Sequence, residues 1–147
     1  MADFTLITAR LATGAALSDP ADVAALKAAG ITHVIDLRGE FDDAALLAGA
    51  GLVYRWNPTE DDGTLKPAAW WDASLAFAVS AYQTLGTCLL CHCAAGVNRG
   101  PSTAYAVMRA CWGYDAVSAE AQIRTARPQA QLAYARQFDA YWAARGT

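Results

Sequence analysis

The sequence predicts a single-domain α/β fold in which helices flank both faces of a central, mainly parallel sheet of four to five strands. Runs of β-branched and apolar residues alternate with segments of helical periodicity, the pattern typical of such a sheet. The chain has 147 residues, of which 55% are hydrophobic and 17% charged, so one domain can bury a substantial core. We find no internal repeat, low-complexity segment or interdomain linker, which predicts one domain over residues 1–147.

The predicted strands are short runs of β-branched and apolar residues bounded by turn residues. The N-terminal run TLITARLATG is expected to form one or two of them. The others are expected at 31–37 (ITHVIDL), 52–56 (LVYRW) and 87–91 (TCLLC). The polar segment NPTEDDGTLKP follows LVYRW and predicts a loop that Asn57 and Pro58 shape.

Capping residues and periodicity mark the predicted helices. Asp19 and Pro20 suit the N-cap and first helical position, and Gly30 suits the end of that helix. FDDAALLAGAG predicts a short helix that ends at glycine. The remaining helices follow from apolar stripes and from Gly or Pro stops, and are expected at 67–85, 101–112, 118–127 and 131–145.

The stretch LLCHCAAGVNRGPSTAYAVM places a tight loop between the last strand and the next helix. The loop between Cys93 and Arg99 contains only small or medium, uncharged residues: Ala94, Ala95, Gly96, Val97 and Asn98. Successive backbone N–H groups in such a loop, together with the following helix N-terminus, form an anion site. Gly96 can adopt a conformation closed to other residues, and Arg99 can donate two parallel hydrogen bonds to a tetrahedral oxyanion.

Cys93 is expected at the floor of this anion-binding loop. The field that binds a phosphate also stabilises a thiolate, and a thiolate beneath a bound phosphate is a nucleophile directed at phosphorus. The alternative is a buried structural cysteine beside a surface arginine. His92 before the cysteine, glycine in mid-loop, and the flanking strand and helix favour the nucleophile.

The segment HCAAGVNRGPS resembles the signature of the cysteine-dependent protein tyrosine phosphatases, in which His-Cys is followed by five residues and Arg. The compact size, GITHVIDLR and RTARPQAQLAYARQF resemble the small dual-specificity branch, so the resemblance covers nearly the whole chain. It implies a protein tyrosine phosphatase-like fold and hydrolysis of phosphomonoesters through a phosphocysteine on Cys93. It also implies that His92 organises the loop and that the amides of residues 94–98 bind phosphate together with Arg99.

The same family uses an aspartate, on a loop before the cysteine, as general acid and then general base. TEDDG occupies this place, with Asp61 at the family's usual interval before Cys93 and Asp62 one position nearer. We favour Asp61 and keep Asp62 as the alternative. The protonated acid would donate to the leaving oxygen, and its carboxylate would then activate water. Without the cysteine loop, these residues would predict only a solvated acidic loop.

The chain departs from the family directly after the arginine. The family usually has Ser or Thr there, and its hydroxyl hydrogen-bonds the cysteine sulfur and helps it leave. Gly100 has no hydroxyl, although Ser102 or Thr103 in the first helical turn could substitute. We therefore expect a phosphocysteine that forms readily and hydrolyses slowly. The alternative is a phosphate-binding pseudophosphatase that does not turn over.

The cysteines allow two other interpretations. VIDLRGEF looks like a strand of rhodanese-like sulfurtransferases or arsenate reductases, but sulfur-transferring rhodaneses typically have a loop one residue shorter. CLLCHC could bind zinc, yet only Cys111 and His33 remain as further ligands, so we expect no metal and no cofactor. Strand alternation predicts that Cys88 and Cys91 pack on opposite faces, and either could form a protective disulfide with Cys93.

Composition limits the partners. The net charge of −3 and the scattered basic residues argue against nucleic acid and anionic membranes as partners. No apolar run is long enough to span a bilayer and the N-terminus does not resemble a signal peptide, so we expect a cytoplasmic protein, and a monomer. The neutral loop favours a phosphorylated protein, with phosphotyrosine preferred, or a small aryl phosphate over inositol phosphates.

Overall fold

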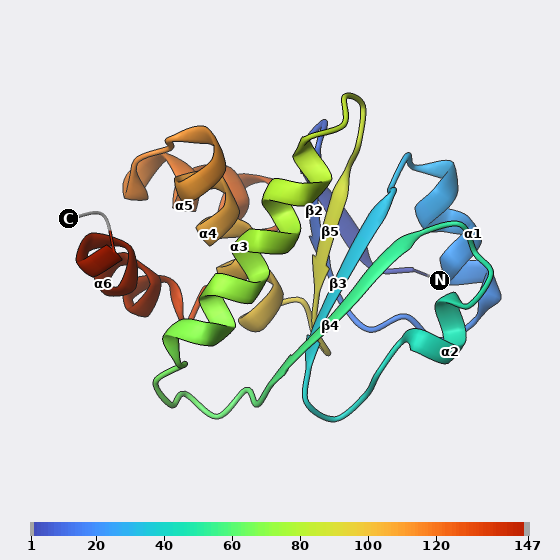
Figure 1. The fold of residues 1–147 in the computed structure, drawn as a ribbon, viewed down its shortest axis with the longest axis horizontal. Coiled ribbons are helices and arrows are strands. Elements are labelled where there is room, and N and C mark those ends of the chain that lie inside the picture. The colour runs from blue at the N-terminus through green and yellow to red at the C-terminus, as the bar shows by residue number, and fades with distance from the viewer. Residues whose placement is uncertain (1, 146–147) are drawn as a thin grey trace.

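The computed structural model describes residues 2–145. Within them, a five-stranded sheet has the order β1-β2-β5-β3-β4 (Figure 1). The strands are β1 (Phe4–Thr8), β2 (Leu11–Gly14), β3 (His33–Arg38), β4 (Val53–Thr59) and β5 (Leu89–His92). The helices are α1 (Pro20–Ala28), α2 (Ala44–Leu47), α3 (Ala68–Tyr82), α4 (Arg99–Trp112), α5 (Ala116–Ala126) and α6 (Ala135–Arg145).

The sheet is mainly parallel, as the sequence predicts. β1 pairs with β2 in the antiparallel sense, whereas β2, β5, β3 and β4 run parallel to their neighbours. Figure 1 shows α1 and α2 on one face of the sheet and α3 to α6 on the other. The carboxyl ends of the parallel strands therefore meet at one edge, the usual position of ligand sites in such sheets.

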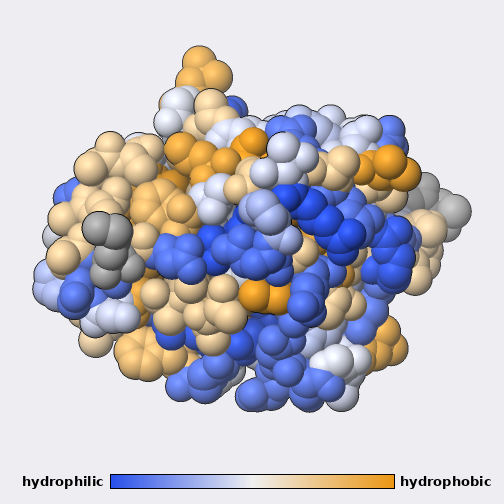
Figure 2. All heavy atoms as spheres, turned by 180° about the vertical axis from the view of Figure 1, so that it is seen from behind, coloured by the Kyte–Doolittle hydropathy of each residue, from blue (hydrophilic) through white to orange (hydrophobic). Residues whose placement is uncertain are grey.

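The sheet separates two hydrophobic cores. Leu89 and Cys91 of β5 belong to the larger core, which lies under α3 to α6. Cys88 and Leu90 belong to the smaller core, which lies under α1 and α2. The prediction that Cys88 and Cys91 pack on opposite faces is confirmed. The hydrophilic residues gather along much of the lower edge of the molecule in Figure 2, where the carboxyl ends of β3 and β5 lie in Figure 1.

The boundaries of β4 differ from the prediction. The sequence predicts that Asn57 and Pro58 shape a loop, but β4 continues through both to Thr59. β4 is an edge strand, where a proline without an N–H removes little from the hydrogen-bond ladder. Asn57 is buried, and its side-chain amide donates to Trp70 O at 3.0 Å and to Ser74 Oγ at 2.8 Å. These contacts with α3 hold the end of the strand in place.

The last helix also begins later than predicted, at Ala135 rather than at 131. Gln131 N and Leu132 N both donate to Val97 O, and Leu132 has a φ of 53°. The segment before α6 is therefore shaped by contacts with the loop that follows β5. Earlier in the chain, Asp19 caps α1 as predicted by accepting a hydrogen bond from Asp22 N. Among residues 2–145, no helix combines the length and the apolar character that crossing a bilayer requires.

Candidate active site

The loop between β5 and α4 is held from outside by its carbonyl groups. Ala94 O accepts from Ala16 N, and Val97 O accepts from Gln131 N and Leu132 N. The buried Arg127 binds the carbonyls of the two residues between Ala94 and Val97, with Nε at 2.8 Å from Gly96 O and Nη2 at 3.3 Å from Ala95 O. A trans peptide directs N–H opposite to C=O. The N–H groups of residues 95–98 therefore point away from these partners.

Gly96 is required by this arrangement. Its φ is 68°, a left-handed conformation that favours glycine. A Cβ atom at this position would also lie 2.4 Å from Arg127 Nη2 and 2.7 Å from Gly14 C. The structure thus gives Gly96 the conformation that the sequence predicts, and adds a close approach that the sequence does not reveal.

Cys93 lies at the start of the loop and is only 2% exposed. Its Sγ accepts a hydrogen bond from Gly100 N at 3.3 Å, and its own N donates to Gly14 O at 3.1 Å. The first turn of α4 therefore directs a backbone donor at the sulfur. A positive helix end and an N–H donor both stabilise negative charge that develops at this atom.

The glycine after the arginine has a steric reason. A Cβ on Gly100 would lie 2.9 Å from Cys91 O and 3.0 Å from Thr13 Oγ1. The first contact is with backbone, so no rotamer change relieves it. Ser102 Oγ accepts from Tyr134 N at 3.1 Å and Thr103 Oγ1 has no hydrogen-bond partner within residues 2–145. Neither of these two hydroxyls is among the described partners of Cys93.

Gly100→Ala is expected to destabilise the fold, because the added methyl group forces the start of α4 away from β5. Overpacking of this kind costs about 1–3 kcal/mol in the free energy of unfolding, measurable by urea denaturation. Gly39→Ala is the matched control, because its Cβ would meet chiefly the flexible end of the Glu60 side chain. Equal losses in the two variants would contradict the steric explanation.

Arg99 is 3% exposed and its guanidinium is held by Glu40. Nη1 donates to Glu40 Oε1 at 2.7 Å, Nη2 donates to Oε2 at 3.0 Å, and Nη1 also reaches Thr59 O at 2.9 Å. Nε is buried and has no partner within the described residues. Buried donors are normally satisfied, so a ligand that offers an oxygen to Nε fits this site.

Sequence reasoning missed Glu40, although its position carries a usable signal. It follows the carboxyl end of β3, and β3 lies beside β5 in the sheet. Residues that follow neighbouring parallel strands meet at the same edge. The hydrogen bond from Arg99 holds the pKa of Glu40 at about 2, well below its ordinary value. Glu40 is therefore ionised throughout the range in which the site would work.

Glu40→Gln is expected to lose a stabilising ion pair in a pH-dependent way. The folded-state pKa lies below the unfolded one, so the carboxylate stabilises the fold above about pH 4.5, and this contribution fades as pH falls towards 2. The side chain is 50% exposed, so solvent screening keeps the effect at or below about 1 kcal/mol. Urea unfolding at pH 7 and pH 3 measures it. Glu60→Gln is the control. If the free energy of unfolding of Glu40→Gln differs from that of wild type by the same amount at both pH values, the assignment is wrong.

The structure brings Asp61 to the cysteine loop and directs Asp62 elsewhere. Asp61 Oδ1 accepts from Tyr134 Oη at 2.8 Å, and Oδ2 lies 3.4 Å from Asn98 Nδ2. Asp62 Oδ1 accepts from the backbone and hydroxyl of Thr64 and pairs with Lys66 Nζ at 3.1 Å. The hydrogen bonds from Thr64, followed by Lys66, lower the pKa of Asp62. Asp62 is thus a stable carboxylate turned into its own loop.

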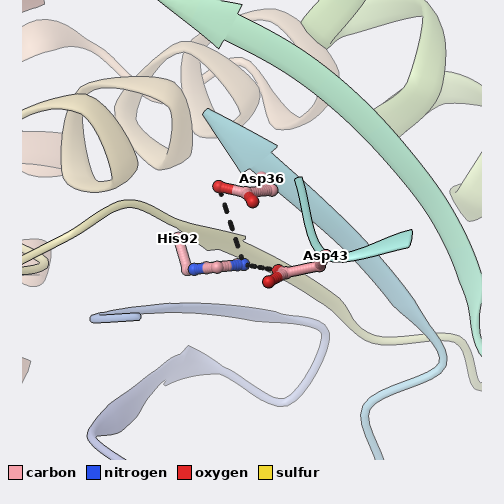
Figure 3. A group of neighbouring side chains, drawn as sticks. All are labelled: Asp36, Asp43 and His92. Carbon is pink, nitrogen blue, oxygen red and sulfur yellow. Dashed lines mark hydrogen bonds and ion pairs between the residues drawn. The ribbon is translucent and has the colours of Figure 1, made fainter. Parts of the chain in front are cut away.

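His92 belongs to a buried charge cluster beneath the loop (Figure 3). Its Nε2 lies 2.5 Å from Asp43 Oδ2 and 3.9 Å from Asp36 Oδ1. Arg38 bridges both carboxylates, with Nε at 3.0 Å from Asp36 and Nη2 at 2.8 Å from Asp43. Burial raises the pKa of Asp36. The cluster joins the end of β3 to the residue that precedes Cys93, so it fixes the orientation of the imidazole.

The same cluster supplies the acidic and imidazole atoms that lie close enough to share a cation. One ligand atom each from Asp36, Asp43 and His92 lies within 4.8 Å of the others. The Arg38 guanidinium already donates to both carboxylates and places a positive charge where a cation would sit, so these residues do not fit a metal ion. Within residues 2–145 no cysteine joins such a group, and the zinc alternative gains no support. A charged Asp-x-Arg pair in an apolar strand was the sequence signal that could have revealed the cluster.

Solved structures share this architecture along the whole chain. The human tyrosine phosphatase-like serine/threonine/tyrosine-interacting protein superposes with a TM-score of 0.83 at 19% identity, over 100% of both chains. Human DUSP28 gives 0.83 at 20% identity, over 98% of this chain and 95% of its own. The chain has the dual-specificity phosphatase fold.

A further solved structure has the same fold, whereas comparison by sequence finds no match. PTPMT1, solved in complex with PI(5)P, gives a TM-score of 0.79 at 19% identity and covers 98% of this chain and 99% of its own. No family model matches the chain, and no curated protein sequence does. The dual-specificity phosphatase fold is thus confirmed by structure at identities too low to carry over an activity.

Proposed function

We propose that the chain is a phosphomonoester hydrolase that acts through a phosphocysteine on Cys93. The main support for the proposal is the hydrogen bonding of the cysteine loop. Its carbonyl groups accept hydrogen bonds from residues outside the loop, so the N–H groups of residues 95–98 remain available for an anion. Arg99 adds a buried Nε without a partner, and Cys93 stands at the start of the same loop. A bound phosphate would satisfy these donors and place phosphorus before the sulfur.

The first step is transfer of the phosphoryl group to the protein. The Cys93 thiolate attacks phosphorus, the S–P bond forms, and the bond from phosphorus to the ester oxygen breaks. Asp61, protonated at the start, gives its proton to the leaving oxygen, so an alcohol or phenol departs. The loop amides and Arg99 stabilise the charge on the non-bridging oxygens, where it develops.

The second step returns the cysteine. Water attacks phosphorus, Asp61 takes a proton from that water, and the S–P bond breaks, with its electron pair returning to Cys93. In this chain the donor placed at the sulfur is Gly100 N, 3.3 Å away, where the family usually offers a hydroxyl. Gly100 adds no hydroxyl to this N–H, so the leaving thiolate has one donor fewer and we propose that phosphocysteine hydrolysis limits turnover.

The proposed substrates are phosphoproteins, phosphotyrosine foremost, and small aryl phosphates. The loop has no basic residue between Cys93 and Arg99, and the side chains that contact it include the acidic Glu40 and Asp61. This charge disfavours ligands that carry several phosphates. The phosphoinositide in the PTPMT1 structure makes that lipid class the informative competitor.

The test is hydrolysis of p-nitrophenyl phosphate across pH 5 to 8, followed by stopped flow and by mass spectrometry of acid-quenched protein. We expect phosphate release, a burst of p-nitrophenol, and a phosphoryl adduct on the peptide that contains Cys93. Binding of vanadate without turnover would instead indicate a phosphate-binding pseudophosphatase. Sulfur transfer from thiosulfate to cyanide would indicate a rhodanese-like enzyme. A phosphotyrosine peptide and a phosphoinositide, compared under the same conditions, test the substrate class.

A further inference from the structure

Tyr134 joins the segment before α6 to the loop that carries Asp61. The ring is fully buried, and its hydroxyl lies 2.8 Å from Asp61 Oδ1 and 3.0 Å from Gly63 N. The backbone N–H of Gly63 can only donate, so the phenolic oxygen accepts from it. The phenolic proton is then directed at Asp61 Oδ1. One hydroxyl therefore fixes the acid loop at two points.

A second residue of the same region reinforces this attachment. Gln137 Oε1 accepts from Lys66 N at 2.8 Å, and Gln137 Nε2 donates to Thr64 O at 3.0 Å. Lys66 Nζ lies over the Tyr134 ring, 4.7 Å from its centroid, and donates to Glu60 O. Both ends of the acid loop are thus fastened to residues 134–137.

The segment that holds the acid loop is itself fastened to the cysteine loop. Leu132 N donates to Val97 O at 3.2 Å, and Ala133 N donates to Asn98 Oδ1, also at 3.2 Å. Tyr134 N donates to Ser102 Oγ at 3.1 Å. Tyr134 therefore binds the residue proposed as acid and belongs to a segment that is hydrogen-bonded to the loop proposed to bind phosphate.

The contact also distinguishes the two carboxylate oxygens of Asp61. Oδ1 is occupied by the tyrosine proton, whereas Oδ2 faces only the longer contact of 3.4 Å with Asn98. The proton is more readily delivered from the oxygen that is held less tightly by donors, which is Oδ2. Burial raises the pKa of Tyr134, so its hydroxyl stays a donor at and above neutral pH.

We propose that Tyr134 is a positioning residue for Asp61, which holds the acid loop over the cysteine loop and leaves Oδ2 to deliver the proton. The inference rests on the proposed function, since it assigns a role within that reaction. It predicts a defect that depends on how strongly the leaving oxygen needs a proton. Phenyl phosphate needs the acid, because phenol is a weak acid, whereas p-nitrophenolate leaves more readily unprotonated.

The experiment compares wild type, Tyr134→Phe, Asp61→Asn and Tyr105→Phe with both substrates. Tyr105 is the matched control, because its buried ring also has a hydroxyl that donates to a carboxylate, that of Asp139 at 2.6 Å. General acids contribute roughly 10² to 10⁴ in rate, and we expect Tyr134→Phe to lose about 10-fold more kcat/KM, which reports transfer of the phosphoryl group to Cys93, with phenyl phosphate than with p-nitrophenyl phosphate. Asp61→Asn should show the same bias more strongly. Tyr105→Phe should show none.

Hydrogen exchange supplies a readout that does not depend on activity. In Tyr134→Phe the Gly63 N–H loses its acceptor, so its exchange should accelerate, whereas Tyr105→Phe should leave it unchanged. Equal losses on both substrates, or no bias in Tyr134→Phe while Asp61→Asn shows one, would overturn the inference and leave the proposed function standing. If wild type releases phosphate from neither substrate, the proposed function fails and the inference fails with it.

Discussion

Cys93→Ser is expected to abolish phosphate release and to leave anion binding in place. A serine hydroxyl stays protonated where a thiol ionises, so the loop that stabilises a thiolate gains no nucleophile from it. Loss of a nucleophile lowers kcat by about 10⁴-fold or more. Hydrolysis of p-nitrophenyl phosphate measures the loss. Titration with vanadate or phosphate should give affinity within a few-fold of wild type, because the loop amides and Arg99 remain.

The control for this variant is Cys111→Ser. Cys111 lies on α4, is half-buried, and packs against the larger core away from the loop. Its replacement should leave kcat within a few-fold of wild type. Residual turnover in Cys93→Ser comparable to that of Cys111→Ser would show that another group attacks phosphorus, and the phosphocysteine mechanism would be wrong.

Arg99→Lys is expected to cost about 10³-fold in kcat/KM, the upper range for removal of an oxyanion donor. Lysine keeps the charge and loses the planar fork, so it cannot hold Glu40 through two bonds and also offer a donor to phosphate. Product inhibition by inorganic phosphate should weaken in parallel. The measurement is the rate with p-nitrophenyl phosphate over a range of substrate concentrations.

Arg124→Lys is the matched control for that prediction. Arg124 lies on α5, is largely exposed, and pairs with Glu120 at 3.1 Å. It should behave as wild type. If Arg99→Lys loses only a few-fold, and only in KM, then charge alone binds the phosphate and the role assigned to Arg99 Nε is wrong.

Local sequence signals were sufficient for the main architecture. Alternating strand and helix runs predicted the parallel sheet, and Asp19 with Pro20 predicted the start of α1. The Cys93 loop was recognisable because its residues are contiguous and their spacing is set by phosphate geometry. Each of these features depends on neighbours within a few positions, where propensity and periodicity carry information.

The remaining features depend on pairs far apart in the chain. Glu40 meets Arg99 and Tyr134 meets Asp61 only because the topology places their segments at one edge of the sheet. The extension of β4 depends on Asn57 reaching α3, and the late start of α6 depends on Val97. No local pattern specifies such contacts, since tertiary hydrogen bonds override propensity at element boundaries.

The close packing at Gly100 restricts how the protein can change over evolutionary time. A serine there would supply the hydroxyl that helps a thiolate leave, yet its Cβ would first collide with Cys91 O at 2.9 Å. That atom is main chain, so the contact is relieved only by a shift of α4 away from β5 and not by a side-chain rotation. A single replacement of Gly100 by serine is therefore expected to cost stability at the same time as it adds the hydroxyl.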